Sequence, residues 1–419
     1  MPVVSKKDME KMGRIMTDSM MTEPLFVRDD RSLEDLAAKL RDCRLLGLDT
    51  EFLTERSYFP RLCLIQIATE NLLAVVDPLE CSNLTLLGEA LTDNVELVVH
   101  SGEQDLAIVD RHLGRVPARV FDTQVAAAFL GYGHRIGYSR LVDTCCGTRP
   151  QSSQAYTDWA KRPLSPAQID YALDDVRYLL RCRSFLMEKL QARGRLEWAQ
   201  QECELARARA LEGYDPYRQW RKVSGVRGLN GQQLAVLREI AAWREEQAAA
   251  RNDPRQRIIS DRVLIELARR GPRRPAELRN YRGLHPNEVS RSADAIIAAV
   301  GRGQQQPPES LPARPSRSSP DDDPNVSALA TLLDAFLRAR ALEMKISSRL
   351  LANRSDLERL VRHCVNGDLA DDAASRHPLL NGWRRHVAGD DLLRLLRGEL
   401  TLGVKQRQDG RPAVAVKES

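Results

Sequence analysis

The chain lacks any hydrophobic run long enough to cross a membrane, because none of its apolar stretches approaches the roughly 18 residues that a membrane helix needs. Residues 1–23 are polar and lack the apolar segment of a secretory signal. We therefore expect a protein that works in the cytoplasm and has no membrane partner.

The sequence also lacks the cysteine patterns of metal sites and disulfide frameworks. The eight cysteines include no C-x-x-C pair, and the seven histidines show no metal-ligand spacing. This pattern argues against a zinc ribbon and a disulfide framework, and it favours a reducing compartment. We interpret the adjacent Cys145 and Cys146 as packing residues.

Two further kinds of site are absent from the sequence. Residues 131–137 (GYGHRIG) depart from the G-x-G-x-x-G dinucleotide fingerprint, and no G-x-x-x-x-G-K-[ST] phosphate loop occurs. No serine or cysteine has an evident partner base, which argues against a covalent nucleophile. We interpret His100 as a polar residue at the end of a strand rather than as a base.

What is present is the composition of a globular protein, with 42% hydrophobic and 29% charged residues and enough length for two or three domains. Residues 25–210 alternate short apolar runs with helical patterns. Strands are predicted at 45–52, 62–68, 72–77, 96–100 and 120–122, and helices at 84–91, 104–113, 123–130, 139–146 and from residue 165. This order predicts an α/β domain whose mixed sheet is flanked by helices.

Residues 211–303 show helical periodicity alone. Helices are expected there at 232–250, 260–270, 275–280 and 287–301. Residues 304–325 are rich in Pro, Ser and Gln, which is typical of a linker. A second helical domain is expected at 326–403, and residues 1–24 and 404–419 are expected to be tails.

The formal net charge of +5 is unevenly distributed along the chain. Residues 215–303 contain 18 Arg and Lys against 10 Asp and Glu, a net charge of +8, which leaves −3 for the rest. A basic helical module beside an acidic domain suits an enzyme that acts on nucleic acid. The alternative is an arginine-rich helix surface that only contacts solvent.

Candidate catalytic residues begin with Asp49 and Glu51. They are two residues apart in a predicted strand, so their side chains share one face. Burying two like charges together is unfavourable unless a positive group lies between them, although acids at a strand end also commonly face solvent. Asp105 lies where a strand turns into a helix, and a purely structural role at the helix N-terminus is the alternative there.

The helix predicted from residue 165 supplies the remaining candidates. Its Ser-Pro-Ala-Gln start is typical of a capping box with proline in the first turn. Tyr171 and Asp175 are one turn apart on one face, although a packed tyrosine with a satisfied hydroxyl is the usual case. Asp174 lies on another face and is expected to pair with Arg177 at the surface.

Together, the four acids offer carboxylate oxygens, which hard divalent cations such as Mg²⁺ prefer as ligands. Two such ions about 3.5–4 Å apart can activate a water molecule and stabilise the leaving oxygen of a phosphodiester. Tyr171 would orient the attacking water and help to deprotonate it. The residues therefore favour hydrolysis of a phosphodiester with two Mg or Mn ions.

These motifs, in this order, resemble the DEDD-type 3′→5′ exonucleases of the DEDDy subgroup: D-x-E at 49–51, H-S-G-x-x-D-L at 100–106 and Y-x-x-x-D at 171–175. The segments LGLDTEF, SYFPRLCLIQIA, FDTQVAA and TDWAKRPLSPAQIDYALDDVRYL resemble the ribonuclease D family more closely. The likeness covers about residues 25–200. The block at about 220–303 is similar to the helicase-and-RNase-D C-terminal (HRDC) domain, and the block at 326–402 looks like a degraded second copy.

The resemblance implies a ribonuclease-H-like exonuclease domain followed by one or two all-α HRDC-like domains. It implies that Tyr171 positions the water and that four acids are metal ligands: Asp49, Glu51, Asp105 and Asp175. Asp122 matches a family position that we interpret as structural, as the N-cap of the helix at 123–130. Residues 150–154 (PQSSQ) lack the lysine that the family often carries there.

The activity implied by the resemblance is a metal-dependent 3′→5′ exoribonuclease that releases 5′-mononucleotides and needs no other cofactor. Its expected partners are transfer-RNA precursors and other structured RNA 3′ ends. Two alternatives stay open, namely a DNA exonuclease of the same superfamily and an RNA-binding protein without catalysis. The complete set of four acids and the tyrosine favours catalysis.

Overall fold

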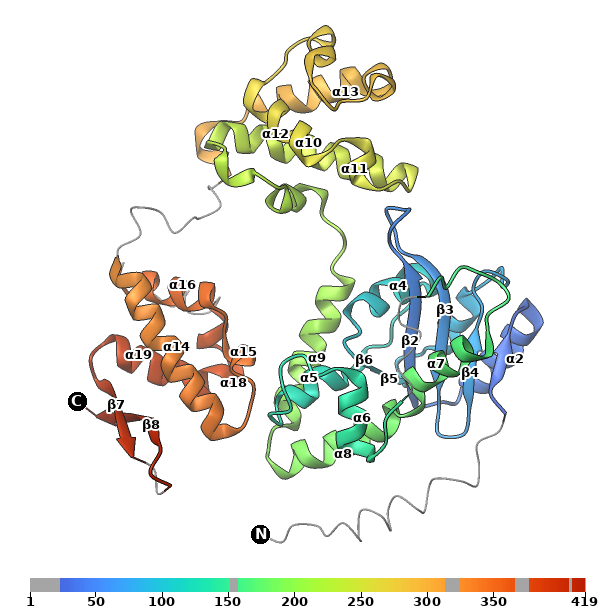
Figure 1. The fold of residues 1–419 in the computed structure, drawn as a ribbon, viewed down its shortest axis with the longest axis vertical. Helices are drawn as coiled ribbons and strands as arrows, with labels where there is room; N and C mark the ends of the chain where they lie inside the picture. The colour runs from blue at the N-terminus through green and yellow to red at the C-terminus, as the bar shows by residue number, and fades with distance from the viewer. Residues whose placement is uncertain (1–22, 151–156, 313–323, 366–376, 407–408, 419) are drawn as a thin grey trace. The chain divides into compact units, whose positions relative to one another are not determined.

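A computed structural model describes residues 23–150, 157–312, 324–365, 377–406 and 409–418 (Figure 1). The chain forms two compact units. The first comprises Met1–Glu51, Leu62–Leu211 and Asp322–Ser419, and the second comprises Phe52–Arg61 and Glu212–Asp321. In these described ranges, no helix is both long and apolar enough to cross a membrane.

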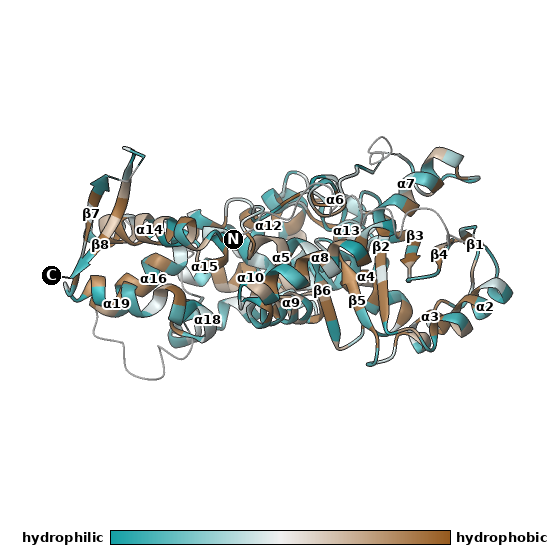
Figure 2. Cartoon of the chain, turned by 90° about the horizontal axis from the view of Figure 1, so that it is seen from below, coloured by the Kyte–Doolittle hydropathy of each residue, from teal (hydrophilic) through white to brown (hydrophobic). Residues whose placement is uncertain are grey.

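The first unit is built on a six-stranded sheet in the order β1-β4-β3-β2-β5-β6. Its strands are β1 (Leu25–Val27), β2 (Leu45–Leu53), β3 (Arg61–Ala68), β4 (Leu73–Val76), β5 (Glu96–Val99) and β6 (Arg119–Asp122). The β3–β4 pair is antiparallel, whereas β5 runs parallel to both β2 and β6. The strands are largely hydrophobic (Figure 2), and β3 and β4 are buried along nearly their whole length. The mixed sheet predicted from the sequence is confirmed.

Helices cover this sheet. They are α2 (Asp30–Leu40), α3 (Thr85–Ala90), α4 (Glu103–Leu113), α5 (Thr123–Ala128), α6 (Tyr138–Cys146), α7 (Pro166–Arg177), α8 (Leu179–Ala192) and α9 (Leu196–Leu211). The helices predicted between residues 84 and 146 are confirmed, with ends shifted by up to two residues. The long helix predicted from residue 165 differs, because it breaks at Tyr178 into α7 and α8. Strand β1 and helix α2 were not predicted.

The last part of the chain belongs to the first unit. Its elements are α14 (Pro324–Met344), α15 (Ser348–Leu351), α16 (Arg354–Val365), η5 (Pro378–Leu380), α18 (Gly382–Arg384), η6 (Arg385–Gly389), α19 (Asp390–Leu396), β7 (Leu400–Gln406) and β8 (Pro412–Glu418). Trp383 stacks on Trp198 of α9 with ring centroids 5.5 Å apart and meets Phe129 edge-on at 5.0 Å. Beside it, Arg384 Nη2 donates to Glu202 Oε2 at 2.7 Å. These contacts join the C-terminal module to the sheet domain.

The tail expected at 404–419 is wrong, because β7 and β8 form an antiparallel hairpin there. Leu402 lies opposite Val416, and Val404 lies opposite Val414. Apolar residues that alternate with a period of two are typical of strands. Here the alternation is short and lies in a segment rich in polar residues, so the sequence alone did not reveal the strands. Residues 1–22 of the expected N-terminal tail lie outside the described residues.

The second unit combines the loop between β2 and β3 with a helical domain. Its elements are η1 (Pro216–Lys222), η2 (Val226–Gly228), α10 (Gly231–Arg251), α11 (Arg255–Ile258), α12 (Asp261–Arg270), η3 (Pro275–Asn280), α13 (Pro286–Gln304) and η4 (Pro308–Ser310). The core is formed by side chains such as Trp220, Leu237, Leu264 and Ile296. The helices predicted in this block are confirmed. Residues 313–323 of the expected linker lie outside the described part of the chain.

Candidate active site

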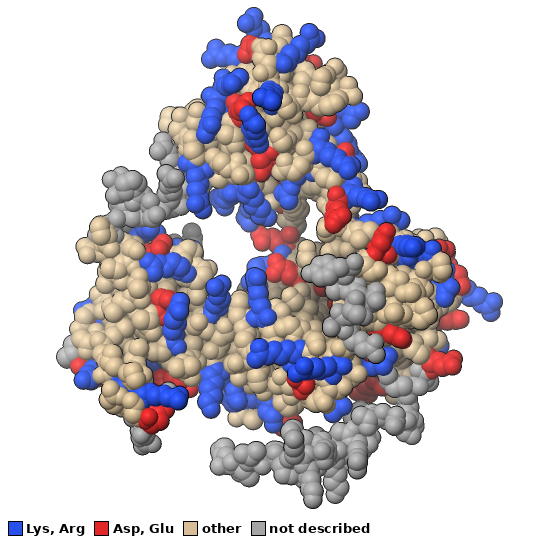
Figure 3. All heavy atoms as spheres, in the orientation of Figure 1, with Lys and Arg blue, Asp and Glu red and all other residues tan. Residues whose placement is uncertain are grey.

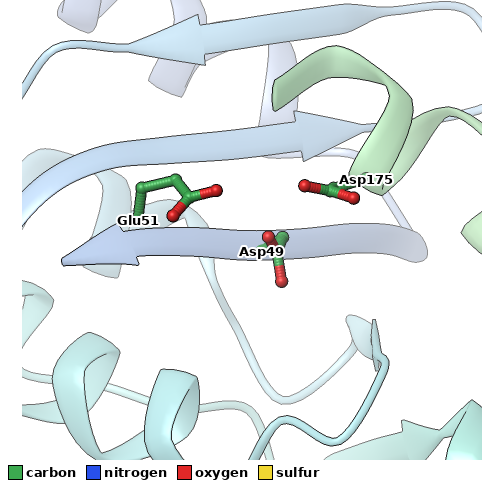
Figure 4. A group of neighbouring side chains, drawn as sticks. All are labelled: Asp49, Glu51 and Asp175. Carbon is green, nitrogen blue, oxygen red and sulfur yellow. The ribbon is translucent and has the colours of Figure 1, made fainter. Parts of the chain in front are cut away.

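Three carboxylates meet beside the middle of the sheet. Asp49 and Glu51 come from strand β2, and Asp175 comes from helix α7 (Figure 4). One carboxylate oxygen from each lies within 4.8 Å of the other two. The predicted grouping of these three side chains is therefore present in the structure.

Helix α7 is placed by the capping box that the sequence predicted. Ser165 Oγ accepts from the backbone N of Gln168 at 3.3 Å, and Gln168 Oε1 accepts from the backbone N of Ser165 at 2.9 Å. The same glutamine donates to Thr157 Oγ1 at 3.1 Å. These hydrogen bonds fix the start of α7. The position of Asp175, about two and a half turns later, then follows from regular helix geometry.

Asp105 lies in the first turn of α4 and is 8% exposed. It stands outside the group of three oxygens, and its Oδ1 accepts a hydrogen bond from the Thr50 hydroxyl. It is still close enough to act on the others, because its charge contributes to the raised pKa values of Asp49 and Glu51. Asp105 therefore lies at the margin of the acidic group.

Asp122 holds the turn that leads into α4. It accepts from the backbone N of Ser101 at 3.1 Å and of Gly102 at 3.0 Å, and it also caps α5. The predicted N-cap role is confirmed. Gly102 is required here, because a Cβ at this position would lie 2.5 Å from Val99 Cγ2. This tight turn carries the chain from β5 into the helix that bears Asp105.

The acids raise one another's pKa values. Burial, reinforced by the charges of Asp105 and Asp175, raises the pKa of Asp49 well above its ordinary value. Burial and the same two charges raise the pKa of Glu51 to about 8. The pKa of Asp175 rises to about 7, mainly through burial. A cation would remove this mutual repulsion, so the group has the electrostatic character of a metal site.

Tyr171 lies one turn before Asp175 on α7 and forms a side-chain hydrogen bond with it. Its ring meets that of Trp159 at 6.0 Å. Burial, together with the charges of Asp175 and the other acids, raises the pKa of the Tyr171 hydroxyl. The hydroxyl is therefore a proton donor at neutral pH, suited to orienting a water molecule.

Neighbouring polar residues take structural roles. His100 Nδ1 lies 2.9 Å from Thr123 Oγ1, and its Nε2 lies 3.1 Å from the backbone O of Ile136. Both ring nitrogens are thus engaged, in agreement with the interpretation that His100 is not a base. Asp174 forms the expected ion pair with Arg177 at 3.4 Å. Residues 151–154, where the family lysine is missing, lie outside the described residues.

Sequence reasoning missed the residues that support the site. Thr50 holds Asp105, but it lies between two acids in a strand, where alternation places it on the opposite face. Tyr138 donates from its hydroxyl to the backbone O of Asp174 at 3.1 Å and so braces α7. Contacts of this kind depend on the packing of segments that are distant in the chain, and no local spacing in the sequence predicts them.

Two acids on an inner strand of a mixed sheet and a third on a covering helix are the arrangement expected of a class of enzymes, the DEDD-type 3′→5′ exonucleases. The family model described as "3'-5' exonuclease" matches residues 24–191, and the model "HRDC domain" matches residues 233–300. The resemblance to a 3′→5′ exonuclease with an HRDC domain, seen in the sequence, is confirmed.

Comparison with individual proteins narrows the class. The chain is 36% identical to ribonuclease D of Granulibacter bethesdensis over 93% of its length and 97% of that protein. It is also 36% identical to ribonuclease D of Nitrobacter hamburgensis, covering 89% and 95% of the two chains. The chain therefore belongs to the ribonuclease D family and is a 3′→5′ exoribonuclease.

Solved structures agree with this assignment. Escherichia coli RNase D, described as an exoribonuclease involved in structured RNA processing, superposes with a TM-score of 0.77 at 29% identity. The match covers 90% of this chain and 99% of that one. The catalytic core of RRP6 from Trypanosoma brucei, at 24% identity and a TM-score of 0.52, shares the fold. The DEDD-type family depends on divalent metal, and the acidic group described above supplies suitable donors.

Proposed function

We propose that this chain removes nucleotides one at a time from RNA 3′ ends, releases 5′-mononucleotides and trims transfer-RNA precursors and other structured RNAs in the cytoplasm. The observation that carries the proposal is the meeting of Asp49, Glu51 and Asp175, whose oxygens lie within 4.8 Å of one another. These three residues belong to the motifs that define the family.

The proposed ligands of two Mg²⁺ or Mn²⁺ ions are Asp49, Glu51, Asp105 and Asp175. Bound ions would polarise a water molecule and neutralise charge on the scissile phosphate. The protein supplies geometry: β2 and α7 hold three carboxylates, and the Thr50 hydroxyl orients Asp105. The Tyr171 hydroxyl donates its one proton to Asp175, so its oxygen would accept from the attacking water and orient the lone pair of that water toward the phosphorus.

The helical domain supports the choice of RNA as the partner. Its residues 215–303 carry a net charge of +8, and Lys and Arg side chains spread over the face of this unit seen in Figure 3. Such a surface attracts phosphates without reading sequence. We propose that it holds the body of the RNA while the 3′ end is cut.

The test is a digestion of 5′-labelled RNA in Mg²⁺ or Mn²⁺, with EDTA as the control. The substrates are a transfer-RNA precursor with a 3′ trailer, a single-stranded RNA and a DNA of the same sequence. We expect a ladder that shortens by one nucleotide from the RNA 3′ end, with 5′-monophosphates as products. Equal digestion of DNA would favour the DNA exonuclease, and RNA binding without cleavage in either metal would favour the non-catalytic alternative.

A further inference from the structure

Three cysteine thiols lie together where helices α6 and α8 pack side by side in the first unit (Figure 1). Cys146 Sγ, at the end of α6, lies 4.0 Å from Cys182 Sγ of α8. Cys145 also forms a side-chain hydrogen bond with Cys182. None of the three belongs to the acidic group, so the proposed reaction leaves their chemistry unused.

The two sulfurs 4.0 Å apart differ in their access to solvent. Cys182 is fully buried, whereas Cys146 is half-buried and is followed by the exposed residues 147–149. Gly147 ends α6 in the left-handed conformation, with φ of 69°. A small oxidant can therefore reach the Cys146 sulfur, and the end of α6, which borders solvent, can adjust as that sulfur moves.

The surroundings of Cys146 favour its thiolate, which is the form of cysteine that attacks peroxides. A hydrogen bond from Cys182 lowers the pKa of the Cys146 thiol, and the charge of Arg181 acts in the same direction against the effect of burial. The two neighbouring thiols and burial raise the pKa of Cys182, which stays protonated. The pair thus combines a reachable sulfur that can attack an oxidant with a buried thiol that can complete a disulfide.

Other cysteines in the described part of the chain have different partners. Cys43 Sγ donates to the backbone O of Leu45 at 3.0 Å, and Cys203 Sγ accepts from the backbone N of Asp122 at 3.3 Å. Such contacts hold a thiol in place without offering it a second sulfur. The neighbouring sulfurs of α6 and α8 therefore do more than fill space between two helices.

Helix α6 also supports the helix that carries a proposed metal ligand. Its first residue, Tyr138, donates to the backbone O of Asp174 at 3.1 Å, next to Asp175 in α7. A disulfide holds its sulfurs about 2.05 Å apart, so forming the bond draws the end of α6 toward α8 by about 2 Å. Because a close-packed interior transmits such a displacement, it reaches Tyr138 and the contact that braces α7.

We propose that Cys146 and Cys182 form a dithiol site that a peroxide oxidises to a disulfide, and that this bond slows the exonuclease reversibly. The Cys146 thiolate attacks one oxygen of the peroxide, the O–O bond breaks, and the leaving hydroxide takes up a proton to form water. The Cys182 sulfur then attacks the resulting sulfenic acid, whose hydroxyl leaves with the Cys182 proton as a second water. The effect on the exonuclease rests on the proposed function. In a reducing compartment such a disulfide is transient, as redox-sensing bonds are.

The experiment treats the wild-type full chain with a small excess of hydrogen peroxide and then with dithiothreitol. Intact mass and peptide mapping follow the bond, and kcat on a single-stranded RNA follows its effect. Cys146→Ser removes the reachable sulfur at a half-buried position. Cys145→Ser is the neighbouring control, and Cys364→Ser, at another half-buried cysteine in α16, is the matched control for general oxidation.

We expect peroxide to remove two hydrogens from the wild type, to join Cys146 to Cys182 and to lower kcat about tenfold. Dithiothreitol should restore both the mass and kcat. Cys146→Ser should keep its kcat in peroxide, while the two control variants should respond as the wild type does. Absence of the bond, a bond that includes Cys145, an unchanged kcat in the oxidised wild type, or an equal loss in Cys146→Ser would overturn the inference.

The mass measurement separates this inference from the proposed function. If the reduced wild type digests no RNA, the proposed activity fails, while a disulfide between Cys146 and Cys182 still supports the dithiol site. If the reduced wild type is active and peroxide forms no such bond, the dithiol site fails and the proposed function stands.

Discussion

Two groups of acids, one in each unit, have opposite surroundings. In the helical unit, Glu245 is enclosed by two arginines and two tyrosine hydroxyls, and Glu288 pairs with Arg251 at 2.8 Å. In the first unit, the strongest influences on Asp49 after burial are other carboxylates. In the helical unit, side chains of the folded chain supply the positive partners of these acids. The acidic group on the sheet has no such partners from the protein among its main influences, and bound cations would supply them.

The largest expected effect is at Asp49. Asp49→Asn keeps the shape of the side chain but removes a ligand charge, so we expect exonuclease activity to fall about a thousandfold or more. The melting temperature without metal should stay equal or rise, because one repelling charge is gone. Asp174→Asn, on the same helix as Asp175, is the control and should remain active. An active Asp49→Asn enzyme would rule out the metal assignment.

The same chemical change should have the opposite effect on stability at Glu245. Glu245→Gln removes the charge that faces Arg244 and Arg255, and we expect a loss of about 2 kcal/mol in the free energy of unfolding. Urea denaturation followed by circular dichroism measures it. A variant as stable as wild type would show that the arginine partners of Glu245 do not contribute to the free energy of unfolding.

A smaller effect is expected from Tyr171→Phe. The ring would still pack against Trp159, but the hydroxyl that orients water would be lost, so kcat should fall about tenfold with RNA affinity retained. Tyr217→Phe, an exposed tyrosine of the helical unit, is the matched control. Wild-type turnover in Tyr171→Phe would remove this residue from the mechanism.

The mildest test uses pH without metal. The pKa of Glu51 is raised to about 8 in the folded protein, so between its ordinary value of 4.5 and about 8 the folded state binds more protons than the unfolded state. Stability of the metal-free protein should therefore decrease as pH rises through this window, by about 5 °C in melting temperature. Added Mg²⁺ should cancel the decrease. A melting temperature that rises with pH in the absence of metal would contradict the raised pKa values.

The sequence was most informative where the pattern is local. Alternation in β2 placed Asp49 and Glu51 on one face, and helical spacing placed Tyr171 beside Asp175. The capping box at Ser165 fixed the start of α7, and the structure has the same bonds. These features depend on neighbours within a few residues, so they can be predicted without knowledge of the fold.

Other features depend on segments far apart in the chain. Nothing near Tyr58 indicates that its hydroxyl meets Glu245, and nothing near Thr50 indicates that it holds Asp105. The sequence predicts a tail where the β7–β8 hairpin lies, because the apolar residues there are few and separated by polar ones. Tertiary partners decide these positions, and a single sequence carries no direct record of them.

The stacking of Trp383 on Trp198, with Arg384 on Glu202, has a consequence for where the polypeptide can be cut. A chain ending at residue 211 would keep all the proposed ligands, yet it would uncover Trp198 and Phe129 and leave the Glu202 carboxylate without its arginine. The catalytic domain therefore relies on the C-terminal module to cover these aromatic rings and to pair this acid. Trp383 and Arg384 follow the helical unit in the chain, so a growing chain can make these contacts only after the helical unit has been synthesised.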